Sequence, residues 1–271
     1  MKFNLKTLVV AAAFVAGGAA NAASLTLDKG GSVTAFGWTV SSLTGSGTLE
    51  FSETLRGALS LADASVTPAG DVELTVVRDP DPSVGYTSIL AKAGVTGLTG
   101  NFDGTTLGIE GVKTSGGATQ TLAASDVSDG GFVTITDLRV DLVNMDVYAN
   151  IVGGNGVGTI NDIKLWHIST ISGPTSFAAV EGVTTAENVL GGLKIYDDAF
   201  NVFVKATGLN ELGAASLSGV NDDPNGYGVI RSTISVTANA VAPAVPEPST
   251  YALMGLGLVG LGLVSRRRAA R

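Results

Sequence analysis

The segment Val72-Glu73-Leu74-Thr75-Val76 decides the fold class, because its apolar and polar side chains alternate strictly. Successive side chains of an extended strand point to opposite faces. Val72, Leu74 and Val76 therefore share one face, while Glu73 and Thr75 share the other. This alternation is typical of a strand with one buried face.

The same period of two recurs along the chain. In residues 141–151 the apolar face carries Val143, Met145, Val147, Ala149 and Ile151, and the polar face carries Asn144, Asp146, Tyr148 and Asn150. Strands are predicted at 32–40, 47–51, 58–66, 72–77, 106–110, 132–136, 139–151, 159–170, 193–206 and 228–237. Clusters of glycine with Asn, Asp, Ser or Thr separate them, as at 128–131 and 153–156, and are typical of turns.

These patterns predict an all-β domain, an antiparallel β-sandwich with many short strands and Gly/Asx turns. A β-solenoid is the alternative, although its fixed short repeat is not visible. A single short helix is expected at 178–190. A flexible join at residues 113–128 is a candidate boundary between two halves. An echo of Leu55-Arg56 in Leu138-Arg139 leaves open the duplication of a β unit.

The composition restricts the chemistry of the chain. It has 271 residues, 37 glycines and no cysteine, which excludes disulfides, thiol catalysis and cysteine metal sites. Without its two ends the chain keeps 10 basic and 23 acidic residues, a formal charge of −13 against −8 for the whole chain. Such a body cannot neutralise phosphates, so nucleic acid is not expected as a partner.

The N-terminal residues 1–22 have the features of a Sec signal peptide. Lys2 and Lys6 precede an apolar segment at 8–18, and Ala20-Asn21-Ala22 forms an A-x-A cleavage site. Cleavage is predicted after Ala22, so the Sec translocon is an expected partner. The body then occupies residues 23–240.

The C-terminal segment has three parts. Residues 241–250 form a proline-rich linker with Pro246-Glu247-Pro248, residues 251–264 are apolar, and residues 265–271 are basic. As a helix the 14 apolar residues would span about 21 Å, less than the about 30 Å of a bilayer core. The segment is therefore a marginal anchor helix, and Arg266, Arg267 and Arg268 should keep its end cytoplasmic.

This order of motif, apolar helix and arginine cluster resembles the PEP-CTERM sorting signal of Gram-negative bacteria. The resemblance covers about 26 residues. It implies recognition by an exosortase, cleavage near the Pro-Glu-Pro motif and transient residence in the inner membrane. It also implies export to the cell surface or the exopolysaccharide matrix, often in biofilm or floc. The alternative is a C-terminal anchor that is never cut.

One histidine, His167, is available for chemistry. A Ser-His-Asp triad needs only one, but no G-x-S-x-G elbow is present. His167 should lie on the strand face opposite Trp166, half exposed, with haem or metal ligation as the alternative.

A calcium site is a second candidate. Asn221, Asp223 and Asn225 place oxygen side chains at alternate positions before Gly226, like the start of an EF-hand loop. The twelfth position is Ser232 rather than glutamate. The turn at 79–83 is also rich in oxygen side chains. The simpler interpretation of both is ordinary turn formation, so no cofactor is expected.

The favoured function is a non-enzymatic protein of the cell surface or matrix that contacts exopolysaccharide or copies of itself. One alternative is an exported polysaccharide hydrolase with a carboxylate pair. Another is a small-ligand carrier, which would need a deep apolar pocket. Tyr148, Tyr196 and Tyr227 could stack on sugars, although core or sheet-edge roles are commoner.

Overall fold

The computed structural model describes residues 22–242, 253–254 and 256. Within it the body forms one compact unit that ends at Ala240. Its elements are β1 (Ala23–Asp28), β2 (Ser32–Ala35), β3 (Trp38–Phe51), α1 (Glu53–Leu61), β4 (Ser65–Ala69), β5 (Val72–Arg78), β6 (Tyr86–Phe102), β7 (Thr106–Ser115), β8 (Gly117–Ser125), β9 (Ser128–Asp141), β10 (Asp146–Gly153), β11 (Gly158–His167), β12 (Thr170–Ser172), β13 (Ser176–Ala178), β14 (Gly182–Gly191), β15 (Lys194–Ile195), α2 (Asp197–Thr207), α3 (Glu211–Asp222) and β16 (Gly228–Ala240).

The predicted all-β, antiparallel class is confirmed. The strands join in one 16-stranded sheet whose main path runs β12-β14-β16-β3-β6-β7-β9-β10-β11-β15. The sheet divides at β6, because the first half of this strand pairs with β3 and β5 and the second half with β1 and β7. This change of partners folds the sheet into facing layers.

Two apolar cores fill the space between the layers. The smaller core joins side chains of β1, β6 and β7 to those of β3, β14 and β16, including Leu27, Phe102 and Ile234. The larger core includes strands β8 to β11 and all three helices. Strands β3, β6, β14 and β16 contribute to both cores, so ladders connect the two halves. The flexible join expected at 113–128 is wrong, because β8 occupies most of it and pairs with β4 and β9.

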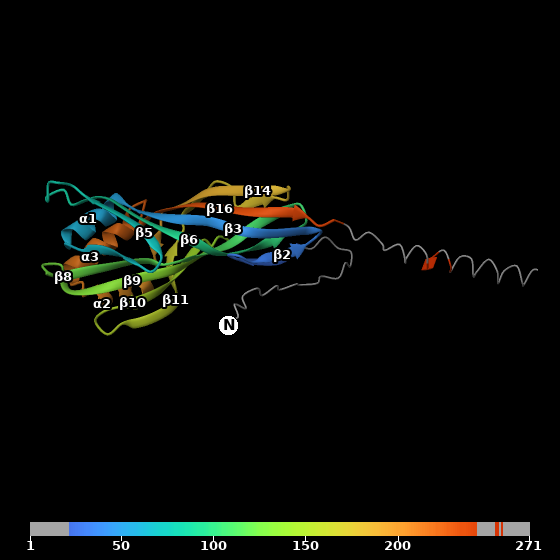
Figure 1. Ribbon diagram of the computed structural model, residues 1–271. Coiled ribbons are helices and arrows are strands. Elements are labelled where there is room, and N and C mark those ends of the chain that lie inside the picture. Colours follow the sequence, from blue (N-terminus) through green and yellow to red (C-terminus); the bar gives the residue numbers. More distant parts are fainter. Residues whose placement is uncertain (1–21, 243–252, 255, 257–271) are drawn as a thin grey trace, which may run out of the picture. The chain divides into compact units, whose positions relative to one another are not determined.

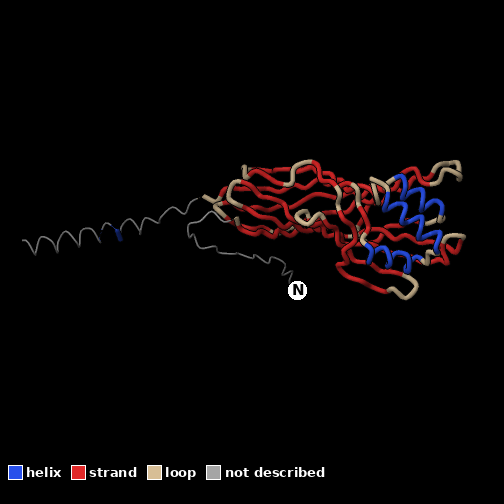
Figure 2. Tube along the Cα trace, turned by 180° about the vertical axis from the view of Figure 1, so that it is seen from behind, coloured by secondary structure: helices blue, strands red, loops and turns tan. Residues whose placement is uncertain are grey.

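The three helices lie together at the end of the body opposite the C-terminal end of β16 (Figures 1 and 2). Helix α1 packs against β6 and α3, while α2 packs against β9, β10 and β11. Ser52 caps the start of α1, because its hydroxyl accepts the Leu55 amide proton at 3.1 Å. The helix buries Leu55 and Leu59, one turn apart. The strand predicted at 58–66 is therefore wrong over its first half.

Two further predictions exchange helix and strand. The strand expected at 193–206 is wrong beyond Ile195, because α2 buries Ala199, Phe203 and Ala206, at helical spacing. Phe200, Val202 and Val204 alternate in the sequence, a spacing that is also typical of a strand. The helix expected at 178–190 is also wrong, because this segment carries β14, paired with β16 over 182–190.

The region 139–151 is a hairpin rather than one strand. Strand β9 ends at Asp141 and β10 begins at Asp146. Met145 has a φ of 59°, which turns the chain, and Val143 is exposed. Duplication of a β unit is not supported, since Leu55-Arg56 lies in α1 and Leu138-Arg139 in β9.

Candidate functional site

An open cleft of about 540 Å³ lies beside the hairpin that joins β9 and β10. Its polar side chains are Thr99, Glu110, Lys113, Arg139, Asp141 and Asn144. They converge because β7 pairs with β6 along most of its length and with β9 through residues 111–113. A side chain at Gly111 would place its Cβ 2.7 Å from the Thr99 hydroxyl oxygen, so glycine allows these strands to approach closely.

The Asp141 carboxylate holds the hairpin beside the cleft. It accepts hydrogen bonds from the backbone amides of Val143 at 3.1 Å and Asn144 at 2.9 Å. The Asn144 side-chain amide adds a third at 2.8 Å. Burial acts to raise the pKa of Asp141, but these donors, led by Asn144, lower it overall. The carboxylate therefore stays ionised at neutral pH.

Arg139 provides a fixed positive charge at the cleft. Its Nε and Nη2 atoms donate to Asp162 at 2.9 and 2.7 Å, a bidentate pair. The guanidinium also lies over the ring of Tyr148, 3.8 Å from its centre. Hydrogen bonding to Asp162 raises the pKa of Arg139. Because the side chain is held on two sides, it is preorganised for an incoming polar ligand.

Glu110 and Lys113 complete the polar wall of the cleft. The Glu110 carboxylate accepts a hydrogen bond from the Asn101 side-chain amide. No ion pair of Lys113 is found in the part of the chain that the structure describes, so its ammonium can meet a ligand. No local pattern in the sequence marks this cleft, because its residues come from β6, β7, β9 and the hairpin.

A second polar cluster lies on β10 and β11, around Asp146. Its carboxylate, only 3% exposed, accepts hydrogen bonds from the Tyr196 hydroxyl at 2.5 Å and from the Lys164 ammonium at 2.9 Å. His167 Nδ1 lies 3.7 Å away. The Lys164 ammonium also lies 4.4 Å from the centre of the Tyr196 ring. This cluster joins β10, β11 and the start of α2.

Hydrogen bonding and burial set the protonation states of this cluster. Burial acts to raise the pKa of Asp146, but the Tyr196 and Lys164 hydrogen bonds lower it overall. Hydrogen bonding to Asp146 raises the pKa of Lys164, and burial raises the pKa of Tyr196. An ionised carboxylate cannot act as a general acid, and a protonated amine cannot act as a nucleophile.

The single histidine lies as the sequence predicts. His167 is the last residue of β11 and its side chain is 46% exposed, whereas Trp166 beside it is fully buried. Among the described residues, no three His, Cys, Asp or Glu side chains are grouped to hold a metal ion. Of the tyrosines considered for sugar stacking, Tyr148 and Tyr196 are partly exposed. The prediction that Tyr227 is exposed is wrong, because this side chain is fully buried in the larger core.

The calcium candidates are engaged in other contacts. The Asn221 side-chain oxygen accepts the Ile195 amide proton at 2.7 Å, and Asp223 accepts the Thr54 hydroxyl proton at 2.8 Å. Asn225 donates its backbone amide to Asp223 at 2.8 Å. The Lys194 ammonium donates to the backbone carbonyls of Asn221 and Asp223. Lys194 thus brings a positive charge to this loop.

In the turn at 79–83 the Asp81 carboxylate likewise accepts hydrogen bonds from within the turn. The Asp81 carboxylate accepts the backbone amide of Ser83 at 3.0 Å and its hydroxyl at 2.8 Å. These bonds lower the pKa of Asp81, with the Ser83 hydroxyl as the main cause. This geometry is that of an Asx turn.

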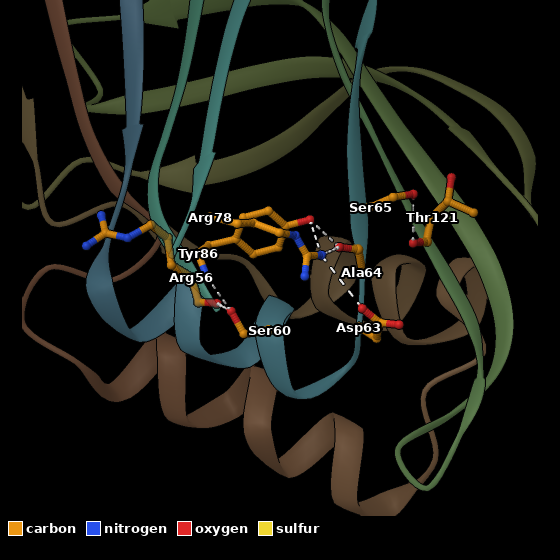
Figure 3. Close-up of polar contacts among 8 residues, drawn as sticks. All are labelled: Arg56, Ser60, Asp63, Ala64, Ser65, Arg78, Tyr86 and Thr121. Carbon is orange, nitrogen blue, oxygen red and sulfur yellow. Dashed lines mark hydrogen bonds and ion pairs between the residues drawn. The ribbon is translucent and has the colours of Figure 1, made fainter. Parts of the chain in front are cut away.

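A partly buried polar network around Tyr86 lies near this turn (Figure 3). Arg78 lies 4.0 Å from the centre of the Tyr86 ring and donates to its hydroxyl at 2.7 Å. The Tyr86 hydroxyl in turn donates to the Ala64 carbonyl at 2.5 Å, and the Tyr86 amide donates to the Ser60 hydroxyl at 2.9 Å. These bonds fasten the end of α1 to β5 and β6, so the network is structural.

The residues of the predicted signal peptide and of the sorting signal lie mostly outside the described residues. Ala20, the sorting motif Pro246, Glu247 and Pro248, and the arginines Arg266, Arg267 and Arg268 fall there, as does most of the predicted anchor helix at 251–264. Ala22 is the first described residue and β1 begins immediately after it. Across the described residues, no helix combines the length and apolar character needed to span a membrane.

Comparison with known proteins identifies the C-terminal segment. Residues 244–268 match the family model of the PEP-CTERM protein-sorting motif. No curated protein and no solved structure matches the chain. The chain therefore carries a PEP-CTERM sorting motif and is an exported protein whose membrane-anchored precursor is processed by an exosortase.

Proposed function

We propose that the body is a non-enzymatic component of the cell surface or exopolysaccharide matrix, which binds polysaccharide through the cleft beside the β9–β10 hairpin. The observation that carries this proposal is the arrangement of Lys113, Arg139 and Asn144 around an open polar cavity of about 540 Å³. Sugar hydroxyls are bound by such donors. The sorting motif indicates that the protein is exported, which supports a ligand outside the cytoplasm.

The packing and strand pairing of the body support a structural role in the matrix. It has no cysteine, so its two cores and long ladders must hold it together. Strands that pass from one core to the other make separation of the halves costly, because backbone hydrogen bonds would have to break. A matrix component that has no disulfides of its own needs this cohesion from packing and strand pairing.

The proposal favours binding over hydrolysis. A glycosidase needs one carboxyl group that stays protonated near neutral pH. Glu110 and Asp141 both line the cleft, but the pKa of Asp141 is lowered. Within the described residues, each carboxyl group with a shifted pKa has it shifted downward: Asp81, Asp103, Asp141, Asp146, Asp162 and Asp223.

Co-sedimentation with exopolysaccharide tests the proposal. Purified residues 23–240 should bind the polymer, and Lys113→Gln together with Asn144→Ala should weaken binding. Lys92→Gln is the matched control, because Lys92 is paired with Glu73 on β5, and it should bind like the unaltered protein. Equal binding by all variants would contradict a role for the cleft, and release of reducing ends would favour the hydrolase.

Gene deletion tests the matrix role itself. Cells lacking the protein should aggregate less and retain less matrix. Restoring the unaltered gene should reverse both defects, and restoring the Lys113→Gln, Asn144→Ala variant should reverse them only in part. Unchanged aggregation and matrix retention after deletion would contradict the proposed role.

A further inference from the structure

The cleft beside the β9–β10 hairpin carries more negative than positive charge. Glu110 and Asp141 supply carboxylates to its walls, and Lys113 and Arg139 supply cations. Arg139 already holds Asp162 in a bidentate ion pair whose closest atoms lie 2.7 Å apart, so its charge is neutralised locally. Lys113 is therefore left to balance both Glu110 and Asp141, and an incoming anion meets a wall that is negative on balance.

A further carboxylate, that of Asp28, lies beside Lys113. Strand pairing places Asp28 of β1 and Lys113 of β7 opposite Gly97 of β6, one on each flank. A Cβ added to Gly97 would lie 3.3 Å from an Asp28 carboxylate oxygen and 3.6 Å from the Lys113 Cδ. The two side chains therefore approach each other over the glycine. The negative charge of Asp28 offsets part of the field of Lys113, which leaves this cation a weaker attraction for anions.

Glu110 is the carboxylate of the cleft that is open to a ligand. Asp141 is occupied by the hairpin, because it accepts the backbone amides of Val143 and Asn144 and the Asn144 side-chain amide. Glu110 accepts the Asn101 side-chain amide, and no backbone amide among the described residues donates to its side chain. Its side chain is partly exposed. Glu110 can therefore act on a ligand, and its charge can be removed without loosening the hairpin.

We infer that Glu110 makes the cleft selective for uncharged sugars over uronic acids and other sugars with an acidic group. A sugar hydroxyl both donates and accepts, so it can pair with the Glu110 carboxylate and with the Lys113 ammonium. An ionised sugar carboxylate cannot donate to Glu110 and is repelled by it. The formal charge of the body, −13 from 10 basic and 23 acidic residues, acts in the same direction. This inference rests on the proposed function, because it names the class of sugar that the cleft binds.

Two chemically altered forms of one exopolysaccharide test this selectivity. One portion is oxidised at its primary hydroxyls to carboxylates, and the other has its carboxyl groups reduced to hydroxyls, so both keep one backbone. In co-sedimentation, residues 23–240 should bind the reduced polymer more strongly than the oxidised polymer, and added salt should narrow the difference. Glu110→Gln should strengthen binding of the oxidised polymer by about 2- to 5-fold, the effect of one partly exposed charge. It should leave binding of the reduced polymer unchanged.

Two further variants separate the local charge from the total charge. Glu187→Gln is the matched control, because it removes one negative charge from the exposed face of β14 and should leave both affinities unchanged. Asp28→Asn, beside Lys113, should act in the same direction as Glu110→Gln. Stronger binding of the oxidised polymer by the unaltered protein, or equal effects of Glu110→Gln and Glu187→Gln, would overturn the selectivity. Failure of the unaltered protein to bind either polymer would instead overturn the proposed function.

Discussion

The Tyr196 hydroxyl donates a hydrogen bond of 2.5 Å to Asp146, a residue fifty positions earlier in the chain. Tyr196 immediately precedes α2, and Asp146 is the first residue of β10. The Asp146 side chain is nearly fully buried, although its neighbours Lys164 and His167 are about half exposed. One carboxylate therefore fixes a helix against two strands.

Removing this carboxylate should destabilise the body. Asp146→Asn loses the charge that receives the Tyr196 and Lys164 bonds, and we expect a loss of about 2 kcal/mol in the free energy of unfolding. Urea denaturation measures it. Glu187→Gln, on the exposed face of β14, is the control and should change stability by less than about 0.5 kcal/mol. Equal effects of the two changes would contradict the assigned role.

The same carboxylate predicts a dependence of stability on pH. The folded pKa of Asp146 is lowered, so its contribution is present above the ordinary aspartate pKa of about 3.9 and is lost as pH falls through the folded value. Stability should therefore decline in acid, and the decline should be shallower in Asp146→Asn. Tm measured from pH 6 down to pH 2, about the range of this titration, tests it. An identical acid slope in both proteins would contradict the prediction.

Two glycines of α3 should respond oppositely to alanine. At Gly219 an added Cβ meets nothing within 4 Å, so Gly219→Ala should stabilise the helix by about 0.5–1 kcal/mol. At Gly213 the Cβ would lie 2.2 Å from the Val127 carbonyl oxygen, so Gly213→Ala should destabilise by about 1–3 kcal/mol. Thermal unfolding compares the two, and a shared sign would contradict the packing of α3 on Val127.

The end of α3 and the turn after it, residues 221–226, should depend on Lys194 rather than on calcium. Lys194→Met removes the donor to the Asn221 and Asp223 carbonyls and should lower Tm. Calcium should leave the Tm of the unaltered body unchanged, because the candidate oxygen atoms are engaged in other hydrogen bonds. A ligand at 100 times its dissociation constant would add about 2.7 kcal/mol to the free energy of unfolding, so calcium binding would be detected. A calcium-dependent rise in Tm would restore Asn221, Asp223 and Asn225 as ligands.

The sorting motif should determine the mass of the mature protein. Processing should remove residues that follow the Pro246-Glu247-Pro248 motif, and Glu247→Ala should leave the tail attached. Mass spectrometry of surface-extracted protein distinguishes the forms. Detection of Arg271 in the surface form of the unaltered protein would show that the anchor is not cut.

Much of the β architecture was predictable because side-chain alternation is a local property. Strand β5 begins at Val72, as its sequence indicates. Helix α2 was not predictable by the same rule, because Phe200, Val202 and Val204 alternate while Ala199 and Phe203 carry the buried helical face. The Asp197 and Lys205 charges and Gly208 after the helix were the signals that favour a helix there.

The candidate site was less predictable because its residues meet only through long-range pairing. Asp146 was assigned to a polar face with Tyr148, yet it is buried, since Tyr196 and Lys164 cover it from other elements. Tyr227 follows a turn that suggests exposure, but contacts with Trp166 and Phe203 place it in the core. Neither outcome depends on residues nearby in the chain.

Strand β16 runs between β3 and β14 and is followed directly by the segment that carries the sorting motif. A force that pulls the C-terminal end of β16 along the strand axis would act on both of its neighbours. Such a load acts in shear, so the hydrogen bonds from Gly228 to Ala240 on one flank and from Ile230 to Ala238 on the other resist it together. A terminal edge strand has hydrogen bonds on one flank only, whereas β16 spreads a load along its axis over two neighbouring strands.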